Sequence, residues 1–140
     1  MFTPTREQAR KFLSDTWQRF QAGEALSGLE RTALDAILMH PEYHPILDAP
    51  ERYLDRDYLP EAGATNPFLH LSLHLAVAEQ LSIDQPPGIR AEYERLTRAL
   101  GAEHDAAHAV LECLGETLWQ AQRLGGAPDE KVYLDCLRRR

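Results

Sequence analysis

Apolar residues recur along this chain at the three- and four-residue spacing of amphipathic helices, and capping signals divide them into five or six segments. Thr5 with Gln8 and Ser27 with Glu30 each match a capping box at a helix start. β-Branched residues are sparse, and no two-residue apolar period is bounded by hairpin turns. The pattern therefore predicts an all-α fold, a helical bundle that forms a single domain over residues 1–140.

The expected helix boundaries leave one long gap. The pattern fails between Pro41 and Asn66, where four prolines and Gly63 indicate a long Pro-rich connection with one helical turn around 51–55. A connection of this length is often functional. The expected helices cover about residues 5–23, 27–40, 67–83, 87–100 and 102–124, with a short last helix after Asp129.

Composition excludes several classes of function. The net charge of −7 disfavours nucleic acid as a partner, because phosphate binding needs clustered positive charge. No apolar run approaches the roughly 18 residues of a membrane span, and the first ten residues lack an export signal. Cys113 and Cys136 form no CxxC motif and cannot build a disulfide framework, so we expect a cytoplasmic protein in which Cys113 is a small apolar filler.

The histidines have the most informative spacing in the sequence. All six fall into pairs four residues apart, which are His40 with His44, His70 with His74, and His104 with His108. Residues four apart lie on the same side of a helix, so both imidazoles of a pair can reach one metal ion.

The pair His70 and His74 shares a narrow stripe with Val77 and Leu81. It is therefore expected on a buried helix face. Each buried imidazole without a partner would cost roughly 1–3 kcal/mol, so a metal ion or carboxylates from another helix must satisfy the pair.

A second set of potential metal ligands recurs every four residues along the expected fifth helix. This row consists of His104, His108, Glu112 and Glu116. The row borders the apolar side of that helix. Imidazole and carboxylate together suit iron, zinc or manganese, and a carboxylate can bridge two ions. Glu112 or Glu116 would be that bridge.

The third pair lies where the expected second helix ends. His40 closes the apolar face of that helix, and His44 follows one turn later between two prolines. The prolines make the segment rigid, which helps to hold a ligand in place.

These patterns predict one or two transition-metal ions in the bundle core, with iron or zinc favoured and manganese as a third candidate. His70, His74, His108 and Glu112 form the inner ligand set, and His40, His44 and Glu116 complete it. His104 is a further candidate ligand. An open coordination position would allow a non-haem iron oxidase or a metal-dependent hydrolase, whereas a closed site would serve structure, storage or sensing. Enzymatic activity therefore stays open.

A different interpretation remains. The histidines could be structural core residues of a non-catalytic interaction module, with residues 41–66 as its docking surface. The sequence identifies no protein partner and leaves homo-oligomerisation open.

The strings HPEYH, NPFLHLSLHLA and EQLSIDQPPGIR, with the H-x-x-x-H-x-x-x-E-C-L-G-E segment, resemble an uncharacterised proteobacterial family of short cytoplasmic proteins. The likeness covers nearly the whole chain and implies no particular activity. The architecture also resembles hemerythrin-like and other di-iron helical bundles, which place His and Glu on facing helices. It departs from hemerythrin because no His is followed five residues later by Asp.

Overall fold

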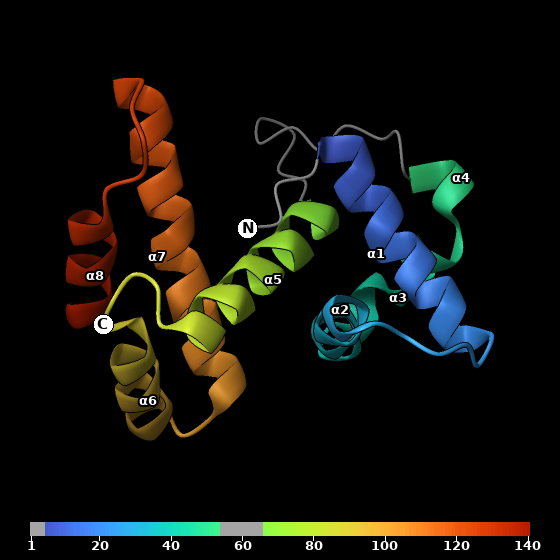
Figure 1. The fold of residues 1–140 in the computed structure, drawn as a ribbon, viewed down its shortest axis with the longest axis horizontal. Coiled ribbons are helices and arrows are strands. Elements are labelled where there is room, and N and C mark those ends of the chain that lie inside the picture. The colour runs from blue at the N-terminus through green and yellow to red at the C-terminus, as the bar shows by residue number, and fades with distance from the viewer. Residues whose placement is uncertain (1–4, 54–65) are drawn as a thin grey trace. The chain divides into compact units, whose positions relative to one another are not determined.

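The computed structural model describes residues 5–53 and 66–140, and within these ranges it confirms an all-α protein (Figure 1). Eight α-helices, one 3-10 helix and no strand occur in the described residues. The helices are α1 (Arg6–Gln21), α2 (Gly28–Leu38), η1 (Pro41–Tyr43), α3 (His44–Asp48), α4 (Pro50–Tyr53), α5 (Pro67–Ile83), α6 (Ile89–Leu100), α7 (Glu103–Leu124) and α8 (Glu130–Arg138). None of these helices combines the length and apolarity that crossing a membrane requires.

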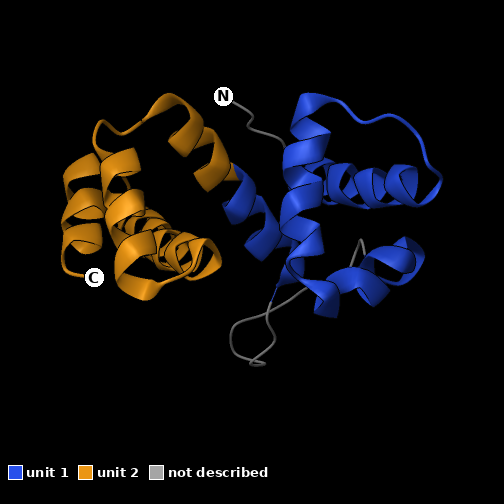
Figure 2. Cartoon of the chain, turned by 90° about the horizontal axis from the view of Figure 1, so that it is seen from below, with its two compact units in different colours: residues 1–75 blue, residues 76–140 orange. Residues whose placement is uncertain are grey.

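The chain divides into two compact units, which are described separately (Figure 2). Unit 1 comprises residues 1–75 and unit 2 comprises residues 76–140. The division falls inside α5, which is one continuous helix. A single domain over residues 1–140 stays a prediction, because two units that share a helix can belong to one domain.

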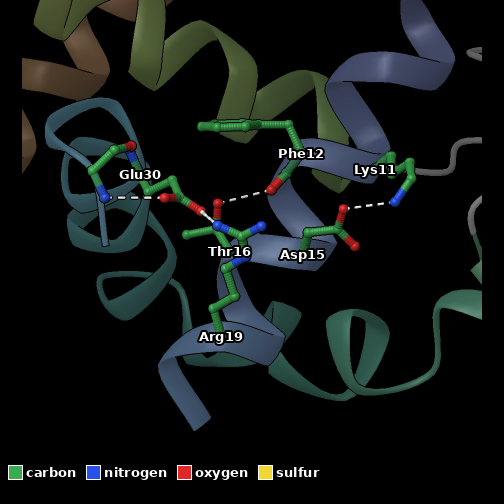
Figure 3. Close-up of polar contacts among 7 residues, drawn as sticks. Lys11, Phe12, Asp15, Thr16, Arg19 and Glu30 are labelled. Atoms are coloured by element: carbon green, nitrogen blue, oxygen red, sulfur yellow. Dashed lines mark hydrogen bonds and ion pairs between the residues drawn. The ribbon is translucent and has the colours of Figure 1, made fainter. Parts of the chain in front are cut away.

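Both predicted capping boxes are present in unit 1. The Ser27 Oγ accepts from the Glu30 N–H, and the Ser27 N–H donates to the Glu30 carboxylate at 3.0 Å. The latter bond holds the pKa of the Glu30 carboxyl below its usual range. The same carboxylate accepts from Arg19 at 3.3 Å and so connects α2 to α1 (Figure 3).

Replacing Ser27 by alanine is expected to lower the free energy of unfolding by about 1 kcal/mol, because the N–H of Glu30 loses its capping acceptor. Urea unfolding monitored by circular dichroism measures this change. Thr32→Ala is the control, since the Thr32 hydroxyl only donates to the Gly28 carbonyl inside the same helix. A loss in S27A no larger than in T32A would contradict the role of the cap.

The apolar core of unit 1 includes residues of α1, α2 and α5, and two histidines of this unit are also buried. Leu13 of α1, Ile37 of α2 and Leu71 of α5 are each almost fully buried. His40 and His74 are also buried, at 3% and 5% exposure. The expectation that His40 and the His70–His74 stripe lie on core-facing surfaces is therefore confirmed for His40 and His74, while His70 is half-buried.

The expected long connection is largely helical where the structure describes it. Residues 41–53 form η1, α3 and α4, so the prediction of one irregular segment from 41 to 66 is wrong for this part. Prolines disrupt helix interiors, but Pro41, Pro45 and Pro50 each lie in the first turn of a short helix, where the missing N–H is not needed. The helical turn expected around 51–55 corresponds to α4, and residues 54–65 of the expected connection lie outside the described residues.

In unit 2, α6 and α8 both pack against α7. Tyr133 and Leu137 of α8 are buried, and the Tyr133 hydroxyl donates to the Gln80 side chain at 2.7 Å. Burial raises the pKa of Tyr133, so the phenol stays protonated and remains a donor.

A disulfide joins Cys113 of α7 to Cys136 of α8. The interpretation of Cys113 as an apolar filler missed this bond.

Candidate metal centre

His40 is held where α2 gives way to η1. Its Nδ1 lies 2.7 Å from the carbonyl oxygen of Ala36. A carbonyl oxygen can only accept, so the proton is on Nδ1 and the Nε2 of the neutral ring carries a lone pair. Metal-binding histidines are commonly oriented in this way, with one ring nitrogen donating to a backbone carbonyl and the other facing the ion.

His70 and His74 follow each other by one turn on α5 and meet His40. The Nε2 atoms of His40 and His70 lie 3.0 Å apart. The His74 ring centroid lies 4.7 Å from that of His40 and 4.9 Å from that of His70. We call His40, His70 and His74 the histidine triad.

The separation of the His40 and His70 nitrogens suits a shared ion. Two imidazole nitrogens at about 2.0–2.1 Å from a tetrahedral zinc ion lie roughly 3.3 Å apart. The observed 3.0 Å is close to this value. Without an ion, one of the two nitrogens must carry a proton to make this contact, whereas a metal ion would accept both lone pairs.

Unit 2 contains a second histidine pair with similar internal geometry. His104 and His108, in the first turns of α7, have their Nε2 atoms 3.1 Å apart and their ring centroids 4.3 Å apart. Both rings are half-buried. This spacing also matches two ligands of one metal ion.

The structure places His44 apart from the triad contacts. Its ring stacks on Trp17 with centroids 4.3 Å apart. Its Nε2 lies 2.9 Å from the carbonyl oxygen of Ile37, so this nitrogen is the donor. His44 follows His40 by four residues, but α2 has already ended and η1 intervenes, so the two rings do not share a helical face.

Glu112 and Glu116 contact the C-terminal part of the chain, at Arg140 and at Cys136 of α8. The Glu112 carboxylate pairs with Arg140 at 2.6 Å, and a Glu116 oxygen lies 3.6 Å from the Cys136 sulfur. Residues four apart advance by about 40° around a helix at each step, so a four-residue row drifts off the face where it starts. By Glu112 and Glu116 the row that begins at His104 faces α8.

Tyr43 also belongs to this environment, although the residue spacing did not indicate it. Its ring stacks on His40 with centroids 5.3 Å apart and an interplanar angle of 5°, and it lies edge-on to His70 at 6.0 Å. The only available signal was its place in the HPEYH string, three residues after His40.

Comparison with known proteins identifies a family and no function. No curated protein and no solved structure matches the chain. Residues 5–139 match a family described as a domain of unknown function, DUF1841. Since the match spans nearly the whole sequence, the chain belongs to the DUF1841 family.

Proposed function

We propose that this protein binds a transition-metal ion through histidine nitrogens, with the triad of His40, His70 and His74 as the core of the site. The observation that carries the proposal is the 3.0 Å approach of two Nε2 atoms, one of which belongs to a ring whose Nδ1–H is committed to Ala36. This arrangement presents a lone pair from a fixed tautomer, which is what a metal ligand requires.

The ligand types favour zinc or iron. Imidazole nitrogen suits zinc, copper, iron and nickel, whereas manganese prefers carboxylate and water oxygens. Glu112 and Glu116 were expected to supply the carboxylates, but Glu112 pairs with Arg140 and Glu116 lies beside Cys136 of α8. A predominantly imidazole site therefore favours zinc or iron over manganese. It also makes a pair of ions bridged by a carboxylate less favourable, because no carboxylate of this row is needed as a ligand.

The remaining ligands determine the role of the ion. If the triad binds alone, a fourth position stays open to water or substrate, as in metal-dependent hydrolases. The prediction that His104 and His108 serve the same ion would give a closed site for structure or sensing.

Metal analysis of protein purified without a histidine tag tests the proposal. We expect close to one equivalent of zinc or iron, and removal by a chelator should lower the midpoint of thermal unfolding, because an ion bound only by the folded state stabilises that state. Less than about a tenth of an equivalent, even after reconstitution, would refute metal binding and leave the histidines as structural core groups.

Metal loading is expected to fall as the pH drops below about 6.5, because a protonated imidazole has no lone pair for the ion. Dialysis of loaded protein against equal free zinc at pH 7.5 and pH 5 measures the loss. Circular dichroism at both pH values controls for unfolding. Undiminished metal in folded protein at pH 5 would contradict a site made of histidines.

A further inference from the structure

The Tyr43 ring packs on the face of the His40 ring. The two rings are nearly parallel, at an interplanar angle of 5°, and the Tyr43 ring also meets the edge of His70. The Nδ1–H bond to Ala36 and the contact of Nε2 with His70 hold the edge of the His40 ring, but contacts at a ring edge do not by themselves prevent the ring from tilting. A parallel ring packed on its face restricts this tilting.

The local sequence explains how Tyr43 reaches this position. Pro41 starts η1 directly after His40, and its fixed backbone angle favours a tight turn. The N–H of Tyr43 donates to the carbonyl of His40 at 2.9 Å and closes that turn. A turn of three residues brings side chains three apart onto the same side, which places the Tyr43 ring over His40.

Tyr43 acts through its ring and not through a charge. The side chain is half-buried, and burial together with the nearby Glu42 raises the pKa of the phenol. The phenol is therefore neutral near pH 7 and offers no counter-charge to a cation. What it supplies beside the triad is a flat apolar surface that packs on an imidazole and excludes water from one side of it.

We infer that Tyr43 is a positioning residue for the metal centre, which sets metal affinity by holding the His40 imidazole in the plane that ligation requires. This inference rests on the proposed metal binding. Residues that orient a ligand typically change affinity by about 10–100-fold when they are removed, without touching the ion. The ring, and not the hydroxyl, is the part of Tyr43 that this role needs.

The test compares Tyr43→Leu and Tyr43→Phe, with Tyr93→Leu as a control. Tyr93 is also a half-buried helical tyrosine with a pKa raised by burial, but it lies on α6 in unit 2. Cobalt(II) replaces zinc as a coloured probe, so that both the affinity and the visible absorption spectrum of the bound ion are measured. Urea unfolding of each metal-free variant reports stability separately.

We expect Y43L to weaken cobalt binding by about tenfold and to alter the ligand-field bands, while Y43F binds as the wild type does. Y93L should keep both the affinity and the spectrum. Wild-type affinity and spectrum in Y43L would overturn the inference and leave the proposed function intact. Equal weakening in Y43F and Y43L would overturn it as well, since the hydroxyl would then be required. Absence of cobalt binding by the wild type would refute both the proposed function and the role of Tyr43.

Discussion

Replacing His40 and His74 together by alanine is expected to lower the affinity for zinc or cobalt(II) by more than about 100-fold, because two imidazole ligands are lost and solvent enters a buried site. Both side chains are buried, and each ring centroid lies within 5 Å of the His70 centroid, at 4.7 Å for His40 and 4.9 Å for His74. Competition titration against a chromophoric zinc chelator measures the affinity of folded protein, and a melt of the metal-free variant confirms that it is folded.

His44→Ala is the matched control for this prediction. The His44 ring packs on Trp17 and donates to Ile37, so its removal should cost stability and leave metal affinity unchanged. Equal loss of metal in the His44 variant and the double variant would show that the triad is not the site.

A further double variant, His104→Ala with His108→Ala, reports whether unit 2 contributes ligands. Wild-type metal affinity in this variant would restrict the site to unit 1.

Reduction of the Cys113–Cys136 disulfide is expected to lower the free energy of unfolding by about 3 kcal/mol. The bond closes a loop with a sequence separation of 23, which covers the end of α7, the following turn and α8. Closing such a loop restricts the unfolded chain far more than the folded one. The ion pair of Glu112 on α7 with Arg140, which follows α8, is exposed and adds little.

Urea unfolding of metal-free protein with and without dithiothreitol measures this effect. The Cys113→Ser, Cys136→Ser double variant is the control, because reductant should not change its stability. Thiol titration before reduction should detect no reactive thiol in the unfolded wild type. Two reactive thiols there, or identical unfolding curves with and without reductant, would contradict the cross-link.

Helix positions could be predicted from sequence because their signals are local. A capping box such as that of Ser27 and Glu30 lies within four residues. The residue that ends a helix often has a positive φ, which glycine adopts easily, as Gly125 does at the end of α7. The same local reasoning failed for residues 41–53, because a proline disrupts the interior of a helix but favours its first turn. Whether a given proline disrupts a helix or begins one depends on where the neighbouring segments allow the helix to start.

The candidate site was predictable only in part. Periodicity placed His74 on a buried face, since four-residue spacing keeps residues on one face over short distances. The same spacing did not predict that Glu116 lies beside Cys136, because the face drifts along a long helix, or that His44 stacks on Trp17, because α2 ends before His44.

The sequence by itself determined the all-α fold, most helix boundaries and the presence of histidine pairs, because each depends on residues within a few positions of one another. Only the tertiary structure decided that His40 meets His70, that Tyr43 packs on His40 and that Cys113 bonds to Cys136. The first and last of these contacts join separate helices, and the second depends on a turn between two helices. Their geometry is set by packing and by backbone turns, which the spacing of residue types along a chain does not encode.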